Sequence, residues 1–184
     1  GAVDFIWNPP YIPGNRLGEN RTPNNWEPEA HIEAFLNPLV DNQYVTKEVI
    51  GEDTSGKYNV YKFTFEPQNY NKTLLITSCI HGNETTGFFD MCHILNLLVN
   101  QWEKYPQLTY LRKNVRLIYV PMVNPWGFAN QKRENVNNVD LNRNFDYNWK
   151  AGKGTDPDKS NFKGKSPFSE KESQNMRSLV PVSY

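Results

Sequence analysis

The stretch LLITSCIHGNE, residues 74–84, is the part of the sequence that decides the fold. It begins with a short apolar run bounded by polar residues, which is typical of a buried strand. His81 and Glu84 follow three residues apart, and binding sites in open α/β sheets form at the carboxyl ends of strands. Because imidazole and carboxylate are common zinc ligands, we predict that His81 and Glu84 bind one Zn²⁺. The alternative is a loop histidine followed by a glutamate that stabilises a helix N-terminus.

A second string, DLNRNF at residues 140–145, has the chemistry of an anion-binding site. Asn142 offers an amide and Arg143 a planar guanidinium, which can hold a carboxylate with two hydrogen bonds. Arg133, upstream, could stabilise the negative charge that develops on a polarised carbonyl. We therefore predict a catalytic role for Arg133 and substrate binding by Asn142 and Arg143. The alternatives are exposed salt bridges for the arginines and a turn position for Asn142.

Length and charge narrow the class of protein. The chain has 184 residues, enough for one well-buried domain, and its 20 basic residues balance its 20 acidic ones. This balance indicates no nucleic-acid partner, and no apolar run approaches the roughly 20 residues that cross a bilayer. Residues 1–30 lack the features of a signal peptide. We expect a globular chain without nucleic-acid or membrane partners.

The pattern of apolar residues predicts an α/β fold with a mixed β-sheet flanked by helices. We expect an extended arm at 1–28 and the domain proper at 29–184. Within the domain the predicted elements are a helix at 29–37 ended by Pro38, strands at 44–51 and 58–65, a buried strand at 72–78, a helix at 88–99, a strand at 115–120, a long loop region at 124–168 and a helix at 169–179.

Several single residues carry further expectations. Ser169 is predicted as the N-cap of the last helix, with Glu172 at the capping-box position. Cys79 and Cys92 lie in apolar contexts and are expected to be buried free thiols. His31 is expected at the surface of the first helix.

Together the strings resemble the zinc metallocarboxypeptidase family (funnelins, the carboxypeptidase A type) from about residue 29 to residue 179. The matching strings are HGNE at 81–84, VNPWGF at 123–128, Arg133, DLNRNF at 140–145 and SPFSEKES at 166–173. HGNE alone is also typical of the related desuccinylase and aspartoacylase branch. The Asn-Pro-x-Gly-Phe string favours the carboxypeptidase branch.

The resemblance implies an α/β sandwich and hydrolysis of a C-terminal peptide bond through a zinc-bound water. It implies that His81 and Glu84 bind Zn²⁺ and that Arg133 assists the scissile carbonyl. Asn142 and Arg143 would hold the free carboxylate of a peptide or small-molecule substrate.

The chain departs from the family pattern at its end. The family's third zinc ligand and general-base glutamate follow the helix that begins near Ser169, and nothing after Arg143 is a histidine. His93, nine residues beyond Glu84, is expected to be a core or groove residue and not a ligand. We therefore expect the N-terminal part of a catalytic domain, incomplete at its C-terminus and inactive alone.

Other functions stay open on the sequence. One is an amidohydrolase or deacylase of the desuccinylase type, or a cell-wall peptide hydrolase. Another is a non-catalytic module that binds carboxylates. Asn83 stands where digestive members carry arginine, so their side-chain preferences cannot be transferred. Cellular location is undecided, and the resemblance favours a secreted or extracytoplasmic protein.

Overall fold

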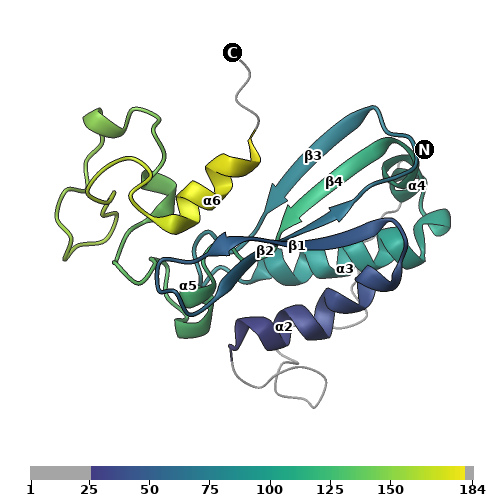
Figure 1. Ribbon diagram of the computed structural model, residues 1–184, viewed down its shortest axis with the longest axis horizontal. Coiled ribbons are helices and arrows are strands. Elements are labelled where there is room, and N and C mark those ends of the chain that lie inside the picture. Colours follow the sequence, from purple (N-terminus) through teal and green to yellow (C-terminus); the bar gives the residue numbers. More distant parts are fainter. Residues whose placement is uncertain (1–25, 181–184) are drawn as a thin grey trace.

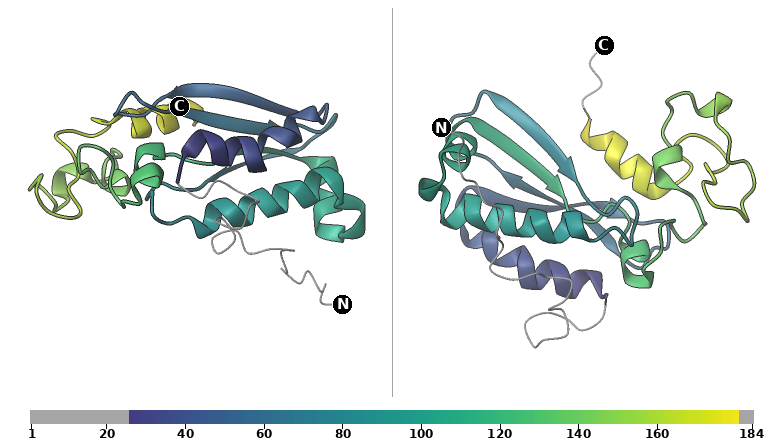
Figure 2. Two further views of the ribbon diagram at one scale, coloured as in Figure 1. Left: turned by 90° about the horizontal axis from the view of Figure 1, so that it is seen from below. Right: turned by 180° about the vertical axis from the view of Figure 1, so that it is seen from behind.

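The computed structural model describes residues 26–180, which form a four-stranded mixed sheet with helices on both faces (Figures 1 and 2). The strand order is β1-β2-β4-β3. The strands are β1 (Val45–Glu52), β2 (Asn59–Phe65), β3 (Lys72–Thr77) and β4 (Val115–Val120). β1 and β2, and likewise β2 and β4, run antiparallel, whereas β3 and β4 are parallel. The predicted α/β class and mixed sheet are confirmed.

Helices provide the crossover between the parallel strands and cover the sheet. They are α2 (Pro28–Phe35), α3 (Thr86–Asn100), α4 (Pro106–Asn114), α5 (Pro125–Asn130) and α6 (Lys171–Leu179). α3 and α4 connect β3 to β4, as the parallel pairing requires. α2 and α3 lie together on one face of the sheet, and α6 lies apart from them beside the loops of residues 140–170 (Figure 1).

Alternation along β2 divides the apolar residues between two cores, because successive side chains in a strand point to opposite faces. Phe63 and Phe65 enter the larger core, which includes Phe88 and Leu98 of α3. Val60 enters a smaller core under α6, where it packs with Met176. Apolar residues thus pack against both faces of the sheet at β2.

Most predicted elements are confirmed, with bounds shifted by a few residues, but neither α4 nor α5 was expected, and α5 lies within the predicted loop region of 124–168. The prediction that residues 72–78 form a buried strand is wrong in one respect. Within residues 26–180, β3 pairs only with β4 and is therefore an edge strand, and Leu74 and Leu75 are 43% and 36% exposed. The same apolar sequence can form a buried strand or a partly exposed edge strand, because strand propensity depends on the position in the sheet.

The expected cap of the last helix is also wrong. The N-cap is Glu170, and it makes no side-chain capping bond. Glu172 is fully buried instead and accepts hydrogen bonds from Thr54 and from Asn135. Its burial raises the pKa of the Glu172 carboxyl, against the lowering effect of these hydrogen bonds. The side chain therefore ties α6 to two distant loops.

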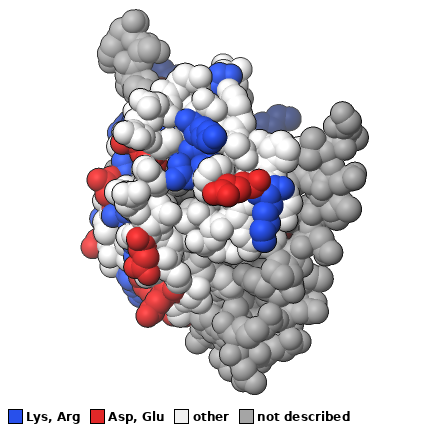
Figure 3. All heavy atoms as spheres, turned by 90° about the vertical axis from the view of Figure 1, so that its right-hand side faces the viewer, with Lys and Arg blue, Asp and Glu red and all other residues white. Residues whose placement is uncertain are grey.

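Both cysteines are buried free thiols, as expected. Among residues 26–180, no helix is long and apolar enough to cross a membrane. On the face that Figure 3 shows, acidic and basic side chains are interspersed among other residues. The predicted arm at 1–28 falls mostly outside the described residues, and α2 already begins at Pro28.

Candidate active site

The site begins where the two parallel strands end side by side. Hydrogen bonds join the segments that leave them: Ser78 N donates to Val120 O at 3.1 Å, and Asn124 N donates to Cys79 O at 2.9 Å. Cys79 adopts a left-handed conformation with φ of 54°, which turns the chain away from the sheet. These contacts bring the loop that carries His81 beside the segment that leads to Arg133.

Two glycines allow this close approach. A Cβ added to Gly82 would overlap the backbone of Gly127 in α5, and one added to Gly127 would overlap the side chain of Asn124. Asn124 itself is fully buried and caps α5, because its Oδ1 accepts from Gly127 N at 2.9 Å. The HGNE and NPWGF strings are therefore in direct backbone contact.

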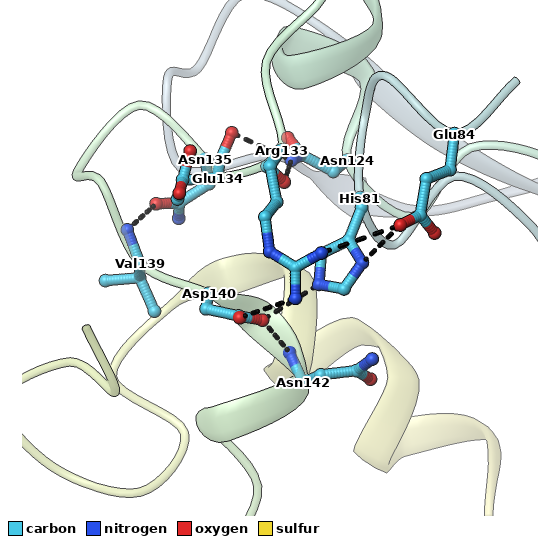
Figure 4. Close-up of polar contacts among 9 residues, drawn as sticks. All are labelled: His81, Glu84, Asn124, Arg133, Glu134, Asn135, Val139, Asp140 and Asn142. Atoms are coloured by element: carbon cyan, nitrogen blue, oxygen red, sulfur yellow. Dashed lines mark hydrogen bonds and ion pairs between the residues drawn. The ribbon is translucent and has the colours of Figure 1, made fainter. Parts of the chain in front are cut away.

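His81 is held between two carboxylates (Figure 4). Its Nε2 donates to Asp140 Oδ1 at 2.9 Å, and its Nδ1 lies 3.3 Å from Glu84 Oε1. The shorter contact, with the buried Asp140, favours the tautomer that carries its proton on Nε2, in which the Nδ1 lone pair faces Glu84 and is available to a metal ion. Metal-ligating histidines are oriented by a carboxylate on their other nitrogen in this way.

Asp140, to which the sequence analysis gave no role, is the buried partner of His81. It is fully buried, its Oδ1 also accepts from Asn142 N at 3.1 Å, and Arg133 Nη2 donates to its Oδ2 at 3.1 Å. Burial by itself raises the pKa of Asp140, but hydrogen bonds and charge from His81 and Arg133 outweigh it and hold the pKa below its ordinary value. Asp140 could have been found as a candidate in the sequence by looking for the acidic partner that a metal-ligating histidine commonly has on its second ring nitrogen.

Arg133 lies in the same cluster. Its Nη1 is 3.5 Å from Glu84 Oε1, so the guanidinium spans Glu84 and Asp140 and is 37% exposed at its side chain. The structure thus brings together three of the predicted residues, His81, Glu84 and Arg133. Arg133 is therefore not an isolated exposed salt bridge, which was the alternative expected from the sequence.

Asn142 and Arg143 lie on a short 3₁₀ turn at Leu141–Arg143, and both are exposed. The amide of Asn142 points away from Asp140 (Figure 4). The neighbouring Asn144 is buried and anchors this turn, since its Nδ2 donates to Lys163 O at 2.9 Å and its Oδ1 accepts from Ser173 Oγ at 2.6 Å. The turn therefore presents Asn142 and Arg143 to solvent from a fixed base.

The residues fit part of a zinc site. Nδ1 of His81 and the Glu84 carboxylate converge, and the second nitrogen of His81 already has its partner. Catalytic zinc takes three protein ligands, however, and within residues 26–180 no group of three His, Cys, Asp or Glu side chains could hold a metal. His93 is 7% exposed, in agreement with the expected core or groove position, and is not part of such a group.

His31 is not a surface residue, contrary to the prediction. It is fully buried and stacks on Trp26, with ring centroids 5.9 Å apart, and its Nδ1 donates to Glu27 O at 2.8 Å. The aromatic residues around it, on α3 and α5, come from distant parts of the sequence, so the pattern of the first helix could not reveal its burial. It lies in the larger core and takes no part in the site.

Comparisons with known proteins relate this chain to the carboxypeptidases. The family model described as zinc carboxypeptidase, Peptidase_M14, matches residues 32–182. Carboxypeptidase M of Mus musculus is 43% identical over an alignment 75 residues long, and the match covers 36% of this chain and 17% of that protein. Carboxypeptidase SOL1 of Arabidopsis thaliana is 39% identical over 66 residues, 36% of this chain and 13% of that protein.

Solved structures show the same fold. Carboxypeptidase A from Helicoverpa armigera superposes with a TM-score of 0.66 at 24% identity, over 81% of this chain and 41% of that one. Thrombin activatable fibrinolysis inhibitor superposes with a TM-score of 0.65 at 20% identity, over 89% and 48%.

The fold and the matched residues define a metallopeptidase architecture, that of the zinc-dependent carboxypeptidases. This chain belongs to the zinc carboxypeptidase family. It spans less than half the length of the two solved structures and less than a fifth of the two curated relatives.

Proposed function

We propose that this chain forms part of the active site of a zinc-dependent metallocarboxypeptidase, which hydrolyses the C-terminal peptide bond of its substrate. The observation that carries the proposal is the orientation of His81. Its Nε2 is fixed by the buried Asp140, so its Nδ1 converges with Glu84 beside an exposed Asn142–Arg143 pair.

His81 Nδ1 and the Glu84 carboxylate would hold the zinc ion. Bound zinc polarises a carbonyl and lowers the pKa of a coordinated water to about 7. Neither the third protein ligand nor the base that accepts the proton of the water is assigned within residues 26–180.

The remaining roles belong to side chains of this chain. Asp140 keeps the proton of His81 on Nε2 and fixes the plane of the ring. Arg133 lies close enough to Glu84 to place its positive charge beside a carbonyl oxygen in which negative charge develops. Asn142 and Arg143 would bind the terminal carboxylate and so position the last peptide bond at His81 and Glu84.

Metal analysis and a peptidase assay on the longest native form of the protein test the proposal. We expect bound zinc and release of single C-terminal residues. A protein that binds no zinc and releases no C-terminal residue would contradict it.

Arg143→Ala tests the carboxylate-binding role directly. Because a hydrogen-bonded ion pair is lost, we expect kcat/KM to fall by roughly tenfold or more on a peptide with a free carboxylate. The same peptide with an amidated terminus should be affected much less. Lys150→Ala, an exposed cation nearby, is the matched control and should change neither value. Equal losses on both peptides would exclude the role.

A further inference from the structure

Arg133 and Asp140 approach each other because the chain between them closes into a short loop. Asn135 N donates to Val139 O at 3.1 Å, and Asn138 N donates to Asn135 O at 2.9 Å. Asn138 adopts a left-handed conformation with φ of 59°, which asparagine tolerates in turns. The position of the Asp140 carboxylate therefore depends on how this loop is held.

The side chain of Asn135 holds the loop from inside. It is buried, with 1% of the residue exposed. Its Oδ1 accepts from Asn137 N at 3.0 Å and from Val139 N at 3.1 Å, the second of which is drawn in Figure 4. Its Nδ2 donates to Glu170 Oε1 at 2.9 Å and to Glu172 Oε1 at 3.0 Å. The four bonds use both lone pairs of the carbonyl oxygen and both protons of the amide nitrogen.

The two acids that accept from Asn135 are buried at the start of α6. Glu170 is 4% exposed, and Glu172 is fully buried. Among residues 26–180, neither forms a salt bridge with a lysine, arginine or histidine. A buried carboxylate without a cationic partner relies on neutral donors, and a hydrogen bond to an ionised group is roughly twice as strong as one between neutral groups. Asn135 therefore joins the loop firmly to α6.

Asp140 is the next residue along the chain from this anchor. It directly follows Val139, whose N–H and C=O both bond to Asn135. Asp140 N also donates to Phe162 O at 2.8 Å. Because this second bond remains, loss of the Asn135 bonds would displace the Asp140 carboxylate and not release it.

A small displacement matters because two carboxylates compete for the ring proton of His81. Asp140 Oδ1 lies 2.9 Å from Nε2, and Glu84 Oε1 lies 3.3 Å from Nδ1. If Asp140 moves away, the tautomer with its proton on Nδ1 gains, and that proton occupies the lone pair that a metal ion needs.

Resting on the carboxypeptidase function proposed above, we propose that Asn135 is a positioning residue of the active site: by tying its loop to α6, it holds the Asp140 carboxylate where it keeps the proton of His81 on Nε2. The bonds of its side chain go to the loop backbone and to α6, so Asn135 acts through Asp140 and not on metal or substrate. Glutamine has the same groups on a longer stem, and aspartate lacks the donors.

Nitrogen-15 NMR of the histidine rings tests the proposal on the longest native form without metal and without any activity. We expect the ring of His81 to carry its proton chiefly on Nε2 in the wild type and to shift toward the Nδ1 form in Asn135→Ala. Asn137→Ala is the matched control, because it removes only a 2.9 Å bond to Glu170 and keeps the backbone bonds of the loop. A wild type protonated on Nδ1, or a tautomer unaltered in Asn135→Ala, overturns the proposal.

A double-mutant cycle on zinc affinity, measured by competition with a chelator, separates positioning from general loosening of the fold. Asn135→Ala should weaken zinc binding by about three- to tenfold, less than loss of the direct partner of His81. In the Asp140→Asn background it should have almost no further effect, because the residue through which it acts is already changed. Equal losses in both backgrounds overturn the positioning role.

Reversal of one hydrogen bond provides a second variant if Asn135→Ala does not fold. Asn135→Asp places a carboxylate against Glu170 and Glu172, and we expect it to shift the tautomer of His81 as Asn135→Ala does. Adding Glu172→Gln returns an amide donor to the same contact and should recover part of the shift. No recovery overturns the proposal.

The outcomes also distinguish this proposal from the carboxypeptidase function. Zinc binding and release of C-terminal residues by the wild type, together with additive losses in the cycle, overturn the role of Asn135 while the function stands. Absence of both zinc binding and release overturns the function, and the tautomer of His81 in the metal-free variants still decides whether Asn135 positions Asp140.

Discussion

His81 shows how a single residue acquires its role from contacts on both sides of its ring. Glu84 is three residues away in the sequence, but Asp140 is 59 residues away and becomes a neighbour only in the folded chain. The pair His81–Glu84 could be predicted because both residues lie in one short loop after a strand. Asp140 could not, because nothing local in DLNRNF shows which of its side chains turns inward.

Asp140→Asn tests whether the buried carboxylate orients His81. An amide can present its NH₂ group to Nε2 and so favours the wrong tautomer, with the proton on Nδ1. We expect zinc affinity to fall by about 10- to 100-fold, as for other partners of metal-ligating histidines. Competition with a chelator of known affinity measures it. Asp146→Asn, an exposed change in the same region, is the control, and an equal effect of both changes would contradict the orienting role.

At the scale of elements, the site depends on contact between the loop after β3 and helix α5 after β4. Parallel strands place their carboxyl ends at one edge of the sheet, which made the common location of the motifs predictable. The edge position of β3 and the burial of Glu172 were not predictable. Each depends on which segments become neighbours, whereas periodicity reports only that a residue has an apolar or polar environment.

Gly82→Ala tests the backbone contact between these elements. Its methyl group would overlap the backbone of Gly127, which cannot move aside as a flexible side chain can. We expect the free energy of unfolding to fall by about 1–3 kcal/mol, as in overpacked sites, and zinc binding to weaken with it. Chemical denaturation followed by fluorescence measures the first effect.

Gly87→Ala is the matched control, because its methyl group would have only an ordinary contact, 3.8 Å from Ser78 Cβ. Gly87 lies in α3, where alanine is favoured over glycine by about 0.5–1 kcal/mol. The two substitutions should therefore change the free energy of unfolding in opposite directions: Gly82→Ala should lower it and Gly87→Ala should raise it. If Gly82→Ala left the free energy of unfolding unchanged, the loop and α5 could move apart without loss of stability, and the prediction would be contradicted.

At the scale of the whole molecule, stability rests on the larger core between the sheet and helices α2 and α3. His31 lies inside this core, and within residues 26–180 its buried Nε2 has no hydrogen-bond partner. Burial lowers the pKa of His31 from its ordinary 6.5, although the Glu27 carbonyl and carboxylate act in the opposite direction. The unfolded chain therefore binds a proton at His31 more readily than the folded chain does.

We predict from this that acid weakens the fold through His31. Well above pH 6.5 the residue is neutral in both states, so it adds no pH dependence there. As the pH falls below 6.5, the unfolded state gains the proton first and the free energy of unfolding decreases, by at most about 1.4 kcal/mol per pH unit. His31→Phe removes this contribution. Denaturation of both proteins from pH 7.5 to pH 5 should show the wild type losing stability relative to the variant, and parallel curves would contradict the prediction.

The sequence by itself determined the α/β class, most of the helices and strands, and the identity of the strings that place this chain among the zinc carboxypeptidases. These features are local: they depend on apolar periodicity and on residues that lie close together along the chain. Only the tertiary structure decided that Asp140 orients His81, that His31 is buried and that Asn135 ties its loop to the acids of α6. Such contacts join segments far apart in the sequence, and packing of the sheet, the helices and the long loop is what selects them.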